Sequence, residues 1–253
     1  MHTKLSAVII TYNEERNIQR CIESLLPVAD EIIVVDSFST DRTEEICKSY
    51  NVDIHKMEWQ GYAKTKNKAQ ALAKHEYILS IDADECLDEQ LISDISQLKN
   101  DHCNGVYTLN RLTNYCGKWI HYSGWNPDWK IRIYPKSLVK WNDAIVHEDL
   151  IIPEDLKKYR LNGRLHHYSY FSKEQHRSKA DQYSRLTAIK YAELGMRCYF
   201  FTPFISAISR FLSMYILHLG FMDGKAGWDI AKISAQSNAF KYFELRRLTT
   251  KIE

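Results

Sequence analysis

Short apolar runs alternate with amphipathic stretches over the first hundred residues. The apolar runs predict four strands, at Leu5–Ile10, Glu31–Val35, Val52–His55 and Tyr77–Ile81. Between them, apolar positions recur at helical spacing, which predicts helices at 18–26, Arg42–Tyr50 and Tyr62–Lys74. Strands that alternate with helices are typical of a parallel sheet with crossover helices, so we expect an α/β fold in this part of the chain.

A polar loop follows three of these predicted strands. The loops are Thr11-Tyr12-Asn13-Glu14, Asp36-Ser37-Phe38-Ser39 and Asp82-Ala83-Asp84-Glu85. Because ligands of open α/β sheets bind at the carboxyl ends of the strands, the three loops predict a binding site. No GxGxxG or GxxxxGK[ST] motif is present, which argues against a dinucleotide oxidoreductase and a P-loop NTPase.

The chemistry of the loops suggests roles for their side chains. Asp82 and Asp84 can hold a hard cation that keeps open positions for phosphate oxygens, although acidic loops are also common on surfaces. Asp36 can accept hydrogen bonds from a base or ribose. The Thr11 to Glu14 loop suits the base and ribose, or it simply starts a helix. For Asp41 we favour a helix-capping role.

The rest of the chain shows a less regular pattern. Strands are predicted at Val106–Leu112 and Lys130–Tyr134, and Ser172 with Gln175 forms a capping box for a helix that reaches about Leu194. The segment Tyr199–Met222 is apolar at helical spacing and long enough to cross a bilayer, but it contains Arg210. A helix in the membrane interface, or one packed on the protein itself or on a partner, fits better than a transmembrane span.

Composition and charge narrow the classes of protein. Hydrophobic residues make up 45% and charged residues 26%, as in an ordinary globular protein. Residues 1–101 hold 11 Lys and Arg against 19 Asp and Glu, whereas residues 156–210 hold 11 against 3. The acidic half suits a divalent metal, and the basic segment suits a phosphate-bearing or membrane-surface partner, or is only a solvated helix face. We expect no nucleic-acid partner.

The N-terminus and the cysteines indicate the compartment. The first apolar run is too short for a signal peptide, and no cleavage site follows it. The six cysteines are scattered, with no CxxC pair. Reduced thiols in the cytoplasm are the simpler interpretation.

Four motifs together resemble a known family. They are VIITYNEERNIQRCIESL, EIIVVDSFSTDRTEEI, the pair Lys66-Asn67, and ILSIDADE. In this order they resemble the family 2 glycosyltransferases with the GT-A fold, a Rossmann-like mixed sheet flanked by helices. Arg132, Val146-His147-Glu148, His166 and Gly220-Phe221-Met222-Asp223-Gly224 resemble more narrowly the lipopolysaccharide core β-glucosyltransferases of the WaaE/KdtX type.

The resemblance implies a role for each matching residue. Thr11, Tyr12, Asn13, Glu14, Asp36 and Ser37 would line the nucleotide site, with Lys66, Asn67, Asp82 and Ala83 near the nucleotide or its diphosphate. Asp84 would bind Mg²⁺ or Mn²⁺ directly, Asp82 would reach the ribose or the metal through water, and His166 and His167 would add a metal or diphosphate contact. Glu148 would be the catalytic base, with Asp149 as the second candidate. The competing roles are a solvated helix face for Lys66 and Asn67, a core position for His166 and His167, and a structural ion pair at 147–149.

These expectations define an inverting transfer of a hexose, with glucose favoured, from a UDP-sugar to a saccharide acceptor. Lipopolysaccharide core or another lipid-linked glycan is the expected acceptor, which places the enzyme in the cytoplasm or on the cytoplasmic face of the inner membrane. The expected domains are a transferase domain at 1–170, divided into a nucleotide half (1–101) and an acceptor half (102–170), and a helical C-terminal region at 171–253. Trp119, Trp125 and Trp129 can stack on sugars or pack in a core. The oligomeric state stays open.

Two alternatives come from other classes of protein. A nucleotidyltransferase also pairs an α/β fold with metal-binding carboxylates, but it predicts a glycine-rich phosphate loop, and Thr11–Arg16 contains no glycine. A non-catalytic membrane-associated scaffold that keeps a degenerate transferase fold is the other alternative. The presence of Asp82, Asp84 and Glu148 argues against the loss of catalytic residues that such a scaffold would show.

Overall fold

The computed structural model describes residues 2–142 and 149–250. The chain folds into two compact units. One unit consists of Met1–Arg111 and Asp128–Tyr168, and the other consists of Leu112–Pro127 and Ser169–Glu253. In this division, residues 112–127 belong with the C-terminal helices.

The first unit is built on a mixed sheet. Its strands in chain order are β1 (Leu5–Thr11), β2 (Glu31–Asp36), β3 (Asp53–Lys56), β4 (Tyr77–Asp82), β5 (Glu85–Leu87), β6 (Val106–Tyr115), β8 (Asp128–Pro135) and β11 (Lys158–Tyr170). They lie in the order β3-β2-β1-β4-β8-β6-β11-β5. Strands β1 to β4 pair in parallel, whereas β8 pairs antiparallel with β4 and β6.

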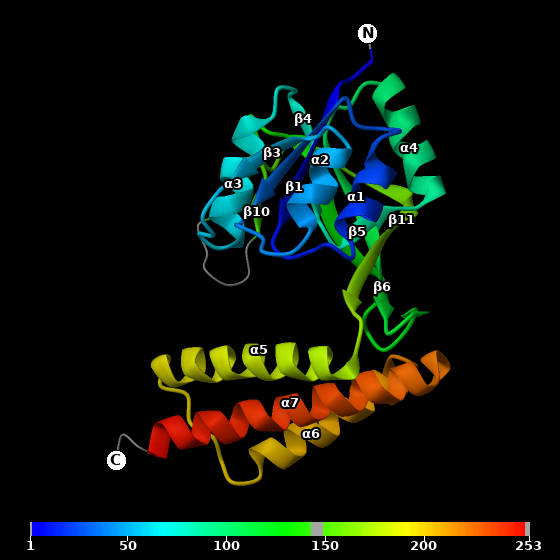
Figure 1. Ribbon diagram of the computed structural model, residues 1–253. Helices are drawn as coiled ribbons and strands as arrows, with labels where there is room; N and C mark the ends of the chain where they lie inside the picture. The colour runs from blue at the N-terminus through cyan, green and yellow to red at the C-terminus, as the bar shows by residue number, and fades with distance from the viewer. Residues whose placement is uncertain (1, 143–148, 251–253) are drawn as a thin grey trace. The chain divides into compact units, whose positions relative to one another are not determined.

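Helices cover both faces of this sheet (Figure 1). They are α1 (Ile18–Leu25), α2 (Thr43–Ser49), α3 (Tyr62–Leu72) and α4 (Glu89–Asn100). The alternation of β1 explains the two layers, because neighbouring side chains of a strand point to opposite faces. Ala7 and Ile9 pack in one apolar cluster with α1 and α4, and Val8 and Ile10 pack in another with α3. The predicted α/β class is confirmed.

The second unit contains the C-terminal helices. They are α5 (Lys173–Glu193), α6 (Thr202–Leu212), a π-helical turn η1 (Ser213–Leu217), a 3-10 turn η2 (Gly220–Asp223) and α7 (Lys225–Thr250). Both α5 and α6 lie along α7 (Figure 1). The predicted cap of α5 is present, because the Ser172 hydroxyl accepts a hydrogen bond from the Gln175 amide. The chain passes between the two units within β6 and at the ends of β8 and β11.

One buried carboxylate organises the second unit. Asp223 is 2% exposed and accepts hydrogen bonds from the backbone amides of His121 and Tyr122, at 3.1 Å each, and from the Ser123 hydroxyl. Nearby, a Cβ at Gly227 would lie 1.8 Å from the Gly220 carbonyl oxygen, so only glycine allows this close approach. Asp223 therefore anchors residues 121–123 to the helices.

Three strands of two residues each complete the strands of the described residues. Strand β7 (Lys118–Trp119) pairs with the end of β6, and β9 (Lys140–Trp141) pairs with β10 (Leu150–Ile151). The predicted apolar helix at Tyr199–Met222 is broken, since α6 gives way to η1 and Leu219 takes a left-handed conformation before η2. In the described residues, no helix has the length and apolar content to cross a membrane.

Candidate functional site

The three polar loops meet at one edge of the sheet. Thr11 at the end of β1 lies opposite Asp36 at the end of β2, and Ile10 lies opposite Asp82 at the end of β4. Because these strands are parallel and adjacent, their carboxyl ends share one edge, as the sequence predicts. The candidate site is built on this edge.

The first two loops are joined by hydrogen bonds. The Asn13 side-chain oxygen accepts a hydrogen bond of 2.8 Å from the Thr40 amide, and the Asn13 amide donates to the Ser39 hydroxyl. The Glu14 amide donates to the Thr43 hydroxyl at 2.8 Å. Asn13 has a φ of 54°, a conformation that asparagine tolerates better than most residues. Asn13 therefore stabilises the conformation of the two loops, since its backbone amide and its side-chain oxygen both form hydrogen bonds with the second loop.

Two hydroxyl groups at the same edge are buried, and neither has a hydrogen-bond partner among the residues that the structure describes. They belong to Thr11, which is 5% exposed, and Ser37, which is 9% exposed. The Asp36 carboxylate beside them accepts hydrogen bonds from the Ser39 amide and hydroxyl. Buried polar groups normally have partners, so two unpartnered hydroxyls point to a bound molecule that completes them.

A charged network surrounds Asp82 at the end of β4. Arg132 Nη2, on β8, lies 2.8 Å from Asp82 Oδ2 and 2.5 Å from Glu85 Oε1. Lys66 Nζ lies 3.1 Å from Asp82 Oδ1, in an ion pair without hydrogen-bond geometry. Burial opposes ionisation of the Asp82 carboxyl, but the charges of Lys66 and Arg132 outweigh it and hold the pKa well below its usual range. Asp82 is thus an ionised carboxylate that lies between two positive charges.

Asp84, two residues later, has a different partner. Its Oδ2 lies 3.2 Å from His167 Nε2, on β11. The register of β11 against β5 places His167 opposite Glu85 and His166 opposite Cys86. Of the two histidines named in the sequence analysis, His167 is the one with an ion pair to Asp84, and its strand neighbour His166 points to the opposite face. Burial lowers the pKa of His166.

The fit of a divalent metal rests on Asp84 and His167. The described residues contain no group of three or more His, Cys, Asp or Glu that could hold a metal. Mg²⁺ and Mn²⁺ sites that also bind a substrate phosphate commonly use few protein ligands and fill the other positions with water and phosphate oxygens. A pair of one carboxylate and one imidazole fits such a site.

Lys66 and Asn67 lie on α3 and both contact Trp141. The Lys66 ammonium lies 4.5 Å from the Trp141 ring centroid, and the lysine is 6% exposed. The Asn67 side chain donates to the Trp141 carbonyl at 2.9 Å and accepts from its amide at 3.0 Å. Asn67 therefore fixes β9 by pairing with its backbone, whereas Lys66 presents its charge to Asp82.

The other predicted residues are distributed as follows. Glu148 lies outside the described residues, and Asp149 is exposed next to β10, with its amide donating to the Asn142 side chain. Ala83 is buried in the apolar core, Tyr12 is 57% exposed, and the Glu14 carboxylate accepts from Asn17. Asp41 accepts from the Thr43 amide and hydroxyl, although the N-cap residue of α2 is Arg42, one position later.

The tryptophans divide between the two units. Trp129 lies under the Arg160 guanidinium, 4.7 Å from its ring centroid. Trp125 packs in a cluster with Tyr115, Tyr170 and His176, at centroid distances of 5.6 to 5.9 Å. The cluster is a packed aromatic core of the second unit, which favours packing over sugar stacking for Trp125.

Sequence reasoning missed two contributions to the site. Trp141 has no motif signal, and Glu85 ends the ILSIDADE motif but received no role, so both roles follow only from contacts with Arg132, Lys66 and Asn67. For the adjacent histidines His166 and His167, the sequence indicates only the pair. The choice between them needs the strand register.

Comparison with known proteins identifies relatives over most of the chain. The model of a family described as glycosyl transferase family 2 matches residues 6–160. A Rickettsia typhi protein described as an uncharacterized glycosyltransferase is 32% identical, over 98% of this chain and 88% of that protein. The lipopolysaccharide core biosynthesis glycosyltransferase LpsC of Rhizobium meliloti is 30% identical, over 83% of this chain and 80% of that protein. Among solved structures, S. aureus TarS 1–349 in complex with UDP-GlcNAc is 16% identical, with a TM-score of 0.46 over 99% of this chain and 91% of that chain.

Proposed function

Because the chain belongs to glycosyl transferase family 2, we propose that it transfers a hexose from a UDP-sugar to a saccharide acceptor of the lipopolysaccharide core or a similar lipid-linked glycan. Glucose is the first candidate for the sugar. The 30% identity to LpsC, a lipopolysaccharide core biosynthesis glycosyltransferase, supports the acceptor class. Such an acceptor places the enzyme at the cytoplasmic face of a membrane.

The observation that carries the donor site is the pair of unpartnered buried hydroxyls beside Asp36. Thr11 and Ser37 lie at adjacent strand ends, on the sheet edge that also carries the Asp82 loop. The ribose hydroxyls and the polar groups of the base would supply hydrogen-bond partners for the Thr11 and Ser37 hydroxyls. Asp36 accepts from the ribose or base, and the exposed ring of Tyr12 offers a stacking surface.

The diphosphate of the donor belongs next to Asp84 and His167. These two residues would hold Mg²⁺ or Mn²⁺, whose charge stabilises the departing nucleoside diphosphate. Lys66 contributes a second positive charge at this edge, since it lies 3.1 Å from Asp82. Arg132 keeps Asp82 and Glu85 in place on either side of the Asp84 turn.

The reaction we propose is a single displacement at the anomeric carbon with inversion. The acceptor hydroxyl attacks the face opposite the leaving diphosphate while a carboxylate accepts its proton. Glu148 is the candidate base, with Asp149 second. Asp149 is exposed and lies directly before β10, so it is open to solvent and to an acceptor.

A donor screen tests this function. The full chain is incubated with Mn²⁺ or Mg²⁺ and a panel of nucleotide sugars, and thermal stability and slow donor hydrolysis are measured. We expect a metal-dependent rise in Tm and hydrolysis with one UDP-sugar. The absence of a response to every nucleotide, with and without metal, would favour a non-catalytic scaffold instead.

A further inference from the structure

Helix α6 and the turn after it expose an apolar face. Six large side chains share this face and form what we call the apolar strip, namely Phe201, Phe204, Ile205, Ile208, Leu212 and Ile216. Each is between 47% and 66% exposed. They recur at helical spacing, so a continuous apolar stripe faces outward where a surface helix normally presents polar residues.

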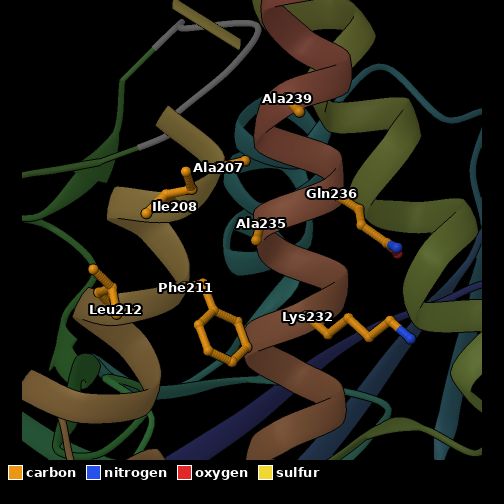
Figure 2. A pocket seen from close by; sticks show the side chains of 8 residues that line it. All are labelled: Ala207, Ile208, Phe211, Leu212, Lys232, Ala235, Gln236 and Ala239. Atoms are coloured by element: carbon orange, nitrogen blue, oxygen red, sulfur yellow. The ribbon is translucent and has the colours of Figure 1, made fainter. Parts of the chain in front are cut away.

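The apolar strip continues into a shallow groove between α6 and α7. Ile208, Phe211 and Leu212 line one side of this groove, and Ala235 and Ala239 line the other. Figure 2 shows Phe211 between the two helices, with Ile208 and Leu212 farther from α7. Small residues on α7 let Phe211 enter between the helices, so α6 keeps its contact with α7 while the apolar strip stays uncovered.

The charge of this unit is strongly positive. It holds 14 Lys and Arg against 7 Asp and Glu, whereas the sheet unit holds 20 against 25. Arg210, Lys225 and Lys232 are exposed in or near the same segment, and among the described residues none of them forms an ion pair. Burial and the charge of Arg210 lower the pKa of the Lys241 ammonium, as expected where positive charges gather without acidic partners.

We propose that the apolar strip of α6 is the surface by which this protein docks onto an anionic phospholipid bilayer. The strip enters the interface between headgroups and acyl chains, and the basic side chains beside it contact lipid phosphates, with their stems along the apolar surface. This is interfacial docking, since no described helix is long and apolar enough to cross a membrane.

Charge favours the bilayer over a second copy of the chain as the occupant. A two-fold dimer through the strip would bring the same basic residues of both copies together, and like charges repel at an interface. An anionic surface neutralises them instead. The proposal deepens the proposed function and rests on it, because an acceptor anchored in the membrane would be reached from the docked enzyme.

Vesicle sedimentation tests this surface with the full chain. Vesicles of phosphatidylcholine alone are compared with vesicles that also contain phosphatidylglycerol, at low and high ionic strength. The test variant is Ile208→Glu, and the matched control is Ile151→Glu on β10, because both isoleucines are 62% exposed. Both variants make the same chemical change, so only the position differs.

We expect the wild type and Ile151→Glu to bind the anionic vesicles, more strongly at low salt, and Ile208→Glu to bind at least about tenfold more weakly. Equal binding by Ile208→Glu and the wild type would overturn the proposal. So would a dimer in light scattering that Ile208→Glu dissociates while no variant binds vesicles. Donor hydrolysis by Ile208→Glu should match the wild type, so a failure of vesicle binding is separable from a failure of the transferase function.

Discussion

Asp84 lies in the turn between β4 and β5, and His167 lies on β11; Asp84 Oδ2 and His167 Nε2 are 3.2 Å apart. This pair predicts that both residues bind the metal. We expect Asp84→Ala to lower transfer by at least about a hundredfold, and His167→Ala to raise the Mn²⁺ concentration needed for half-maximal activity. Activity measured over a Mn²⁺ titration checks both effects.

The adjacent histidine supplies the control for this pair. His166→Ala changes the same residue type one position earlier on the same strand, on the opposite face. Its Mn²⁺ dependence should match the wild type. If His166→Ala shifts the metal dependence and His167→Ala does not, the assignment from the strand register is wrong.

Arg132 predicts a large effect on stability. Its guanidinium contacts Asp82 and Glu85 and Arg132 is 3% exposed, so Arg132→Met leaves the buried Glu85 carboxylate and the partly buried Asp82 carboxylate with reduced compensation. Removal of one partner of a buried ion pair costs about 3–5 kcal/mol of unfolding free energy. Arg42→Met is the control, since Arg42 pairs with Glu45 on the surface and its loss should change the unfolding free energy little. Urea denaturation measures both, and equal losses would contradict the buried network.

His176 predicts a pH dependence of stability. Burial lowers its pKa to about 4, and its Nδ1 lies 3.3 Å from the Tyr115 hydroxyl. An exposed histidine has a pKa near 6.5, so between about pH 6.5 and pH 4 the unfolded state binds the proton more readily. Stability should therefore fall by about 3 kcal/mol as pH falls through this range.

The variant His176→Phe isolates this effect. It keeps an aromatic ring in the cluster and removes the titrating group. Urea midpoints followed by tryptophan fluorescence, with Trp125 centred 5.6 Å from the His176 ring, report on this region. The wild type should lose more stability between pH 7 and pH 4 than the variant. Parallel pH profiles would show that His176 does not titrate as described.

The hydrogen bonds of Asp223 predict that its substitution disorders residues 121–123. Asp223→Ala leaves the His121 and Tyr122 amides and the Ser123 hydroxyl without their acceptor, at a cost of about 2–5 kcal/mol. We expect a lower Tm and a weaker near-ultraviolet circular dichroism signal. Glu244→Ala, which removes a surface ion pair with Arg247, should change little. A Tm for Asp223→Ala equal to that of Glu244→Ala would refute the anchoring role.

The sheet was predictable from sequence where its strands are apolar on both faces. Strands β1, β2 and β4 are almost fully buried, so continuous apolar runs mark them and the polar loop after each is easily seen. Strand β11 has no such run, because much of it is partly exposed and its residues are mostly polar. Its role in the site was therefore visible only as an isolated histidine motif.

The candidate site shows the same limit at the level of single residues. The motifs identify Asp82, Asp84 and Lys66 as a group, but they do not indicate that Asp82 is paired with both Lys66 and Arg132. The choice between His166 and His167 depends on strand parity, and the pairing of Asn67 with Trp141 joins residues far apart in the sequence. These contacts arise from tertiary packing, which a local pattern does not encode.

The passage of the chain between the two units has a practical consequence for shortening the protein. An N-terminal fragment that ends at Tyr168 would retain residues 112–127, because they are inserted between two parts of the sheet unit. That insert would lose Asp223 and the apolar contacts of Ile120 with Met214 and Ile230. Exposed tryptophans and free backbone amides would then promote aggregation, so a soluble sheet unit would require replacement of the insert by a short polar linker between Arg111 and Asp128.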